Sequence, residues 1–222
     1  MKIQRLRLYT SNLQQQKRFY AETLGLPTQD ADDGGLVVEA GATMLTFFPA
    51  EEPYYYHFAF NISPYQYDAA LAWLKSRVIV LSDNGTELID FSNWNAYAMY
   101  FEDAGGNIVE FIARRDLELP EVVPFGSQAI HSVSEIGLSV RQVGEAFDVI
   151  HRETALPFYS GNRSNFCAAG DPEGLFILVD PEDKDWYPAD RPARMSPLEV
   201  HFEEQGQVYK LSLEAGNITI TR

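Results

Sequence analysis

Apolar and polar residues follow one short pattern that the chain carries twice. Residues 5–10 alternate in the manner of a β-strand, a stretch with helical spacing follows, and Leu26-Pro27 ends the pattern. Residues 135–140 open the same order, which ends at Leu156-Pro157, so the offset is 130 residues at both ends (135 − 5 and 156 − 26). An offset preserved across a strand, a helix and a turn indicates a duplicated structural unit.

The same periodicity predicts four units along the chain. Helical spacing of apolar residues predicts three helices, at residues 13–24 after an N-cap at Ser11 or Asn12, at 67–77 and around 143–150. Alternation predicts strands at residues 3–10, 36–38, 43–48, 57–62, 96–101, 108–112, 135–140, 165–169, 175–179, 198–203, 208–213 and 218–221. Three units therefore read as β-α-β-β, and the fourth has strands without a helix.

The four units predict an α+β fold made of two tandem modules. Residues 1–113 form the first module, and residues 130–222 form a second, shortened one. Between them, residues 114–129 are acidic, contain two prolines and show no periodicity, so we expect a linker there. The sequence leaves open whether each cleft forms within one chain or across a homodimer.

Charge and cysteine content narrow the range of partners. The formal net charge is −15, and an acidic surface repels nucleic-acid phosphates and anionic lipid headgroups, so we expect no nucleic-acid or membrane binding. Cys167 is the single cysteine and has no partner for an intrachain disulfide. The first residues lack the apolar run of a secretion signal, and no stretch approaches the roughly 18 apolar residues of a membrane span. We therefore expect a soluble, cytoplasmic protein that binds a small molecule.

Three segments of the chain resemble the vicinal oxygen chelate superfamily, which includes glyoxalase I, bleomycin-resistance proteins and extradiol dioxygenases. Residues 8–13, followed by residues 18–26, resemble the first strand, turn and helix end of a family module. Residues 100–111 resemble its closing hairpin, and residues 135–140 resemble the opening strand of a second module. The resemblance implies tandem βαβββ modules whose mixed sheets curl around a cleft, the second module being truncated. It indicates a fold rather than a reaction, because one fold hosts many chemistries.

The resemblance also implies a metal site, whose ligands would come from the first and last strands of a unit. His57 and Glu110 occupy these positions in the second unit, whereas Arg5 stands where a histidine is common in the first. A guanidinium stays protonated and does not coordinate cations, so we expect Arg5 to bind an anionic group of the substrate instead. His57 and Glu110 are the expected catalytic residues and metal ligands, and iron, manganese or zinc would suit them. All three side chains are expected to meet in one hollow.

Further candidates extend this site. Glu135, Glu199 and His201 are weaker candidates for metal ligands from the second module. Trp94 and Tyr97 are expected to contribute to an apolar wall that binds the substrate, and residues 185–188 could form a lid or an ordered excursion.

Each of these residues also has a purely structural interpretation. His57 could be a hydrogen-bonded strand histidine, and Glu110 could pair with Arg5 across the sheet. Glu135 could pair with Arg7 or Arg141. Cys167 is expected to be a packed small residue, since no histidine is adjacent to it in the sequence.

Two functions remain open from the sequence. The first is a metal-dependent enzyme that acts on a small oxygen-rich molecule as a lyase, an isomerase or a ring-cleaving dioxygenase. The second is a metal-free protein that binds or sequesters a small molecule, as a resistance protein does, with Arg5, His57 and Glu110 as a polar network. The missing third ligand favours the second function, and the family resemblance favours the first.

Overall fold

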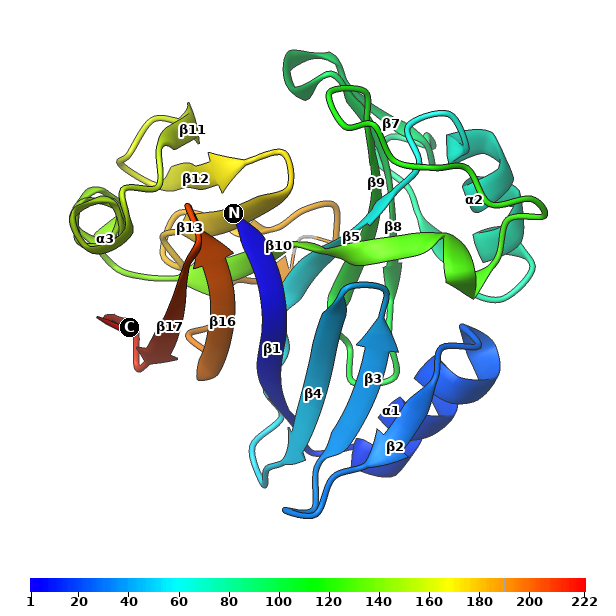
Figure 1. Ribbon diagram of the computed structural model, residues 1–222, viewed down its shortest axis with the longest axis horizontal. Coiled ribbons are helices and arrows are strands. Elements are labelled where there is room, and N and C mark those ends of the chain that lie inside the picture. The colour runs from blue at the N-terminus through cyan, green and yellow to red at the C-terminus, as the bar shows by residue number, and fades with distance from the viewer. Residues whose placement is uncertain (190) are drawn as a thin grey trace.

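The computed structural model describes residues 1–189 and 191–222 and contains two large mixed β-sheets (Figure 1). In hydrogen-bonded order, the seven-stranded sheet consists of β18 (Asn217–Thr221), β17 (Gln207–Glu214), β16 (Leu198–Glu204), β1 (Lys2–Thr10), β4 (Thr43–Pro49), β3 (Leu36–Ala40) and β2 (Thr28–Asp30). The nine-stranded sheet consists of β11 (Phe158–Gly161), β12 (Phe166–Asp171), β13 (Gly174–Val179), β10 (Ile130–Ser139), β5 (His57–Ile62), β9 (Ile108–Arg114), β8 (Ala96–Glu102) and β6 (Val80–Leu81), with β7 (Ile89–Phe91) paired to β8. A separate hairpin joins β14 (Asp185–Trp186) to β15 (Arg191–Pro192).

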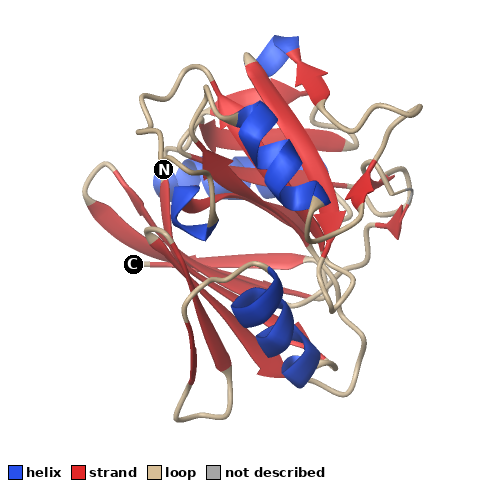
Figure 2. Ribbon diagram, turned by 90° about the vertical axis from the view of Figure 1, so that its right-hand side faces the viewer, coloured by secondary structure: helices blue, strands red, loops and turns tan. Residues whose placement is uncertain are grey.

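The helices pack against these sheets. Helix α1 (Leu13–Arg18) continues into a π-helical turn (Phe19–Thr23) and contacts β4, whereas α2 (Tyr67–Lys75) contacts β8 and β9. Figure 2 looks from the side of α1 and α2 and shows each helix lying against its own sheet. Helix α3 (Val143–Thr154) contacts β12 and β13 of one sheet and β18 of the other. Short 3-10 turns occur at Ser92–Trp94 and Ser127–Ala129.

The predicted helices and main strands are confirmed, and so is the α+β fold class. The predicted fourth unit contains β16, β17 and β18 and no helix, as expected for residues 198–222. The short strands β6, β7, β11, β14 and β15 were not predicted, because two to four residues give too little periodicity to recognise.

Strand pairing joins the units in an order that the sequence does not reveal. Strand β1 of the first unit pairs antiparallel with β16 of the fourth, and β5 of the second pairs antiparallel with β10 of the third. The proposed division into modules 1–113 and 130–222 stays a prediction. In both large sheets, strands from one proposed module form hydrogen bonds with strands from the other. Arg114, which the sequence analysis places in the linker, is the last residue of β9.

The main hydrophobic core takes one face from each large sheet. In β5, Phe58 and Phe60 point into this core and pack near Phe111 of β9, whereas His57 and Ala59 point to the opposite face. Strands β5, β9 and β13 are buried at every position, so both of their faces are covered. Polar residues that these three strands carry on the second face of the sheet are therefore buried.

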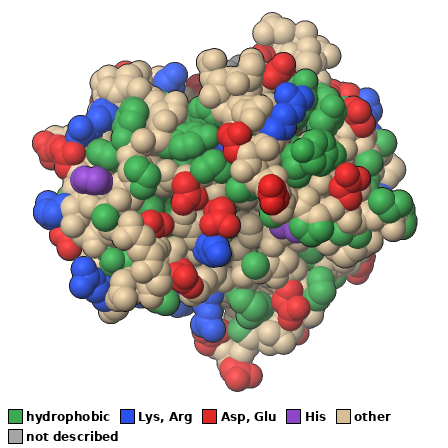
Figure 3. Space-filling view, turned by 45° about the horizontal axis from the view of Figure 1, so that its top comes forward, with side chains coloured by type: hydrophobic (Ala, Val, Ile, Leu, Met, Phe, Trp, Pro, Cys, Tyr) green, Lys and Arg blue, Asp and Glu red, His purple; other side chains and the backbone are tan. Residues whose placement is uncertain are grey.

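The outer surface mixes both signs of charge. On the face shown in Figure 3, acidic and basic side chains are interspersed, and hydrophobic side chains are exposed between them. No helix in the described part of the chain has the length and hydropathy needed to cross a bilayer. The expectations that the protein binds neither nucleic acid nor membranes stay predictions.

Replacing Phe111 with alanine should remove the aromatic centre of the main core. Its ring is fully buried and lies 5.4 Å from that of Phe101 and 6.0 Å from that of Phe60, between centroids. We expect Phe111→Ala to lower the free energy of unfolding by about 3–5 kcal/mol, through lost burial and a residual cavity. Urea denaturation measures this loss. Val208→Ala, at a half-exposed position of β17, should change stability by less than about 0.5 kcal/mol; a comparable loss in both variants would contradict the assigned core.

Candidate functional site

Three side chains with acid–base character converge in the middle of the nine-stranded sheet, on the face turned away from the main core. In the register of β5 with its two neighbours, Ala59 stands opposite Glu110 of β9 on one side and Glu135 of β10 on the other. His57 precedes Ala59 by two residues and so shares its face. Because the alanine side chain is a single methyl group, the carboxylates can approach each other over it. One ligand atom each of His57, Glu110 and Glu135 lies within 4.8 Å of the others.

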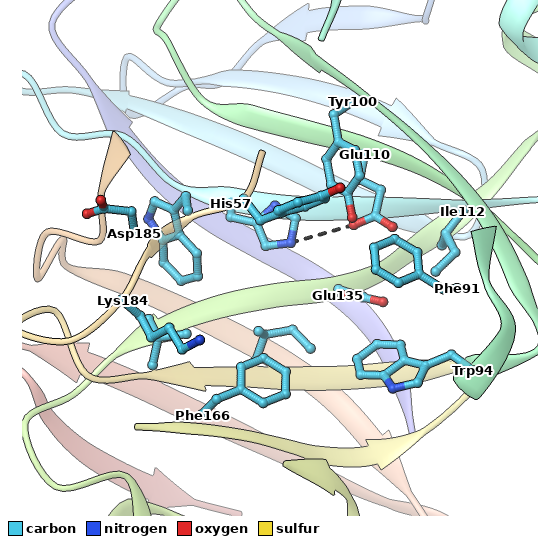
Figure 4. Close-up of a pocket in the computed structure, with 14 residues that line it drawn as sticks. His57, Phe91, Trp94, Tyr100, Glu110, Ile112, Glu135, Phe166, Lys184 and Asp185 are labelled. Carbon is cyan, nitrogen blue, oxygen red and sulfur yellow. Dashed lines mark ion pairs between the residues drawn. The ribbon is translucent and has the colours of Figure 1, made fainter. Parts of the chain in front are cut away.

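The backbone orients the imidazole of His57. Its Nδ1 lies 3.2 Å from the carbonyl oxygen of Ile108, so an Nδ1–H donates to that oxygen and Nε2 carries the lone pair. Nε2 faces Oε2 of Glu110 at 3.6 Å, which is longer than a hydrogen bond (Figure 4). Burial lowers the pKa of His57 to about 4, so the ring is neutral at pH 7.

The two carboxylates share one buried cation. Glu135 forms an ion pair with Arg114, and both side chains are almost fully buried. Burial raises the pKa of Glu135, and Arg114 opposes this rise. The pKa of Glu110 is held well above its usual range by burial and by the charge of Glu135. Burial and the neighbouring carboxylate therefore favour the protonated form of Glu110, and a second cation in the cluster would favour its charged form.

The three residues of the cluster line a cavity of about 230 Å³. Its walls are aromatic and aliphatic side chains from both halves of the nine-stranded sheet and from the hairpin: Phe91, Trp94, Tyr100, Ile112, Phe166, Ile177, Val179, Trp186 and Tyr187. Lys184 and Asp185 also line it (Figure 4).

Trp186 of β14 covers the sheet beside the cluster, with its ring centroid 5.5 Å from that of His57. It packs so closely on Gly137 that a Cβ at that position would collide with the indole. The segment around it is tethered to the sheets. Ser139 Oγ donates to the carbonyl of Ala193 at 2.6 Å, and Arg191 pairs with Glu102 at 2.8 Å. Residues 185–188 thus belong to an ordered cover over the cavity.

The expected meeting of Arg5 with His57 and Glu110 is wrong. Arg5 is exposed on β1, opposite His201 of β16 and Met44 of β4, and it does not line the cavity. The physical reason is that the first unit pairs with the fourth, which places β1 in the other sheet. The alternative pairing of Glu110 with Arg5 fails for the same reason.

Other candidates divide between the site and the rest of the molecule. Trp94 lines the cavity as expected, but Tyr97 lies on the opposite face of β8, where its ring centroid is 4.5 Å from that of Tyr67 on α2. Glu199 lies in the seven-stranded sheet and pairs with Lys210 at 2.6 Å, and His201 lies on the same strand. Both are therefore outside the His57 cluster.

Glu135, a weaker candidate from the sequence, is the third member of the cluster. Its partner is Arg114 rather than Arg7 or Arg141. Sequence reasoning did not identify Arg114, Tyr100 and Lys184 as neighbours of the site. A detectable signal existed for Arg114: it follows Glu110 by four residues, and even spacing in a strand places both on one face.

Comparisons with known proteins identify the fold. No protein-family model matches the sequence, and no curated protein matches it significantly. The structure of a putative dioxygenase from Bacillus subtilis aligns over 96% of this chain and 84% of its own, with a TM-score of 0.60 and 17% identity. A glyoxalase I variant from Zea mays aligns over 80% of this chain and 66% of its own, with a TM-score of 0.54 and 12% identity. The chain therefore has the fold of the vicinal oxygen chelate superfamily, and the resemblance in sequence is confirmed at the level of fold.

Removing the buried cation should destabilise the protein in a pH-dependent way. Arg114→Met leaves Glu135 without its partner, and breaking a buried ion pair from one side costs about 3–5 kcal/mol. Loss of the guanidinium raises the pKa of Glu135 further. The penalty should be larger at pH 8 than at pH 5.5, because a group whose pKa is raised in the folded state loses stability as the pH rises.

Urea denaturation of three variants at both pH values tests this expectation. The double variant Arg114→Met/Glu135→Gln should recover part of the loss, because no charge is then left unpaired. Arg163→Met removes a partly exposed pair with Asp148 and should cost at most about 1 kcal/mol. Equal losses for Arg114→Met and Arg163→Met would show that the buried pair carries no special weight.

Proposed function

We propose that this protein holds one divalent metal ion through His57, Glu110 and Glu135, and that it acts on a small oxygen-rich molecule in the adjoining cavity. One imidazole nitrogen and two carboxylates form a donor set that suits iron, manganese or zinc. The fold of glyoxalases and dioxygenases supports a metal-dependent lyase, isomerase or ring-cleaving dioxygenase. Fold alone does not choose among these reactions.

One observation carries this proposal: the arrangement of His57 against Glu110. The Ile108 carbonyl accepts the Nδ1–H, which directs the lone pair of Nε2 at a carboxylate oxygen 3.6 Å away. Two acceptors that face each other require a proton or a cation between them. A histidine that donates its other ring N–H to a backbone carbonyl has the orientation found in metal sites.

The residues around the three donors have separate roles in this proposal. Bound metal would act as a Lewis acid that polarises substrate oxygens. Arg114 fixes the side chain of Glu135 through their ion pair. Burial, together with the charge of Glu110, raises the pKa of Tyr100 well above its usual range, so its phenol stays protonated and can donate to a substrate oxygen. The apolar side chains of the walls lower the local dielectric and so strengthen these interactions.

A metal-free binding protein is the second candidate function. The Arg114–Glu135 ion pair and a proton on Glu110 would together neutralise the cluster without a metal ion. The cavity could then bind its molecule through aromatic contacts and the polar atoms of His57, Glu110 and Tyr100. Assembly into a homodimer and a cytoplasmic location stay predictions.

Titration with Mn²⁺, Fe²⁺ or Zn²⁺ should raise the thermal unfolding temperature of the wild-type protein. A ligand that binds only the native state adds about 2.7 kcal/mol at 100 times its Kd. The gain should be larger at pH 8 than at pH 6: His57 is neutral at both, whereas Glu110, with its raised pKa, must lose a proton to bind metal. Elemental analysis of protein purified without added metal measures stoichiometry directly.

The variants His57→Ala and Glu110→Gln should lose the metal-dependent stabilisation. Glu199→Gln alters an acidic residue on the other sheet and should keep it. If the wild-type protein purifies without metal and no ion stabilises it between pH 6 and pH 8, the metal-dependent function is wrong. The metal-free function would then be the one to pursue, by mass spectrometry of a co-purified small molecule.

A further inference from the structure

We infer that the molecule bound in this cavity is a flat aromatic compound with one anionic substituent, and that Lys184 is the residue that recognises the anion. This inference deepens the proposed function, since it concerns the same cavity and names the class of molecule that would enter it. It depends on the walls and on Lys184, and not on whether the His57 cluster holds a metal.

The walls set the size and shape of the ligand. Aromatic side chains dominate them, with Phe91 and Trp94 contributed from one part of the sheet, Phe166 from another and Trp186 from the hairpin (Figure 4). Aromatic rings pack favourably against such side chains in stacked or edge-on arrangements. A cavity of about 150 Å³ accommodates benzene, so the volume of about 230 Å³ has room for one ring with substituents.

Among the residues that the structure describes, Lys184 is the one lysine or arginine that lines the cavity. In Figure 4 its ammonium turns toward the space between the walls, whereas the carboxylate of its neighbour Asp185 turns away from it. The other lysines each pair with a carboxylate, as seen for Lys2, Lys17, Lys75 and Lys210. Across residues 1–189 and 191–222, no ion pair engages Lys184, although the net charge of the protein is −15.

The cavity is therefore electrically polar. The carboxyl groups of Glu110 and Glu135 line the cavity from the strands of the sheet, and the ammonium of Lys184, which has no ion-pair partner among the described residues, belongs to the loop that borders the space. A ligand with a carboxylate or a similar anion gains by turning it toward Lys184 and away from the glutamates. Its ring then lies between the aromatic walls, and its remaining oxygens face His57 and Glu110.

Benzoate and benzamide provide matched probes, because they have nearly the same size and shape and differ in charge. Binding of each is measured by quenching of tryptophan fluorescence, with EDTA present so that no metal can coordinate the carboxylate. Wild-type protein should bind benzoate about fivefold more tightly than benzamide, the size of effect expected for a partly exposed ion pair. Lys184→Met should bring this ratio to about one while leaving the affinity for benzamide unchanged.

Two control variants separate recognition from general charge effects. Lys184→Arg keeps a cation in place and should retain the preference for benzoate. Lys75→Met removes an exposed lysine of α2 that pairs with Glu87, and should also retain it. The inference is overturned if Lys184→Met keeps the preference, if Lys75→Met loses it equally, or if neither probe binds the wild-type protein. If no metal ion stabilises the protein but the preference for benzoate is preserved, the metal-dependent function is wrong and this inference stands. If a metal ion stabilises the protein but the preference for benzoate is absent, this inference is wrong and the metal-dependent function stands.

Discussion

The pairing of β5 with both β9 and β10 is the constraint on which the site depends. It sets Ala59 between Glu110 and Glu135 and places His57 two residues away on the same face. A slip of one residue in either register would exchange the two faces of a strand. In β9 it would send Glu110 into the main core and Phe111 into the cavity, and in β10 it would exchange Glu135 and Ile136 in the same way. The apolar alternation of Phe58 and Phe60 opposes such a slip, because both rings are buried on the core side. Core packing therefore determines the geometry of the polar cluster.

Burial of two carboxylates next to each other creates a need for positive charge. Arg114 supplies one unit of it, from the same face of β9 as Glu110, and Glu135 receives that charge directly. The second negative charge is then balanced by a proton, as the raised pKa of Glu110 indicates, or by a cation that also engages His57. The buried Trp186 packs beside His57 and lowers the local dielectric, which strengthens each of these interactions. A bound metal ion and a bound proton are therefore two alternative ways to neutralise the second carboxylate.

Local sequence patterns predicted the units, the helices and the two most informative site residues, but not how the units associate. Strand alternation and the repeat identify where β1, β5, β10 and β16 begin each unit, and the family resemblance selects His57 and Glu110. Long-range packing decides which of these first strands pair with each other, and local patterns do not reveal it. The sequence analysis therefore expected Arg5 to meet His57 and Glu110, although β1 lies in the other sheet. Arg114 was missed because it precedes Arg115 and Asp116 and so resembles the start of a charged linker. Its burial becomes visible only when its pairing with Glu135 and its packing on Trp94 are known.

The polar residues of the two large sheets lie in different physical settings. On the seven-stranded sheet, Glu199 lies between Lys210 at 2.6 Å and Arg7 at 3.8 Å, and all three side chains remain partly exposed to water. Solvent screens such exposed pairs, so each contributes little to stability. In the fourth unit, β17 returns antiparallel to β16 without a preceding helix. The nine-stranded sheet instead carries a buried cluster, in which the carboxyl groups of Glu110 and Glu135 lie beside the lone pair of His57. Because water screens these groups little, they favour the binding of a proton or a cation.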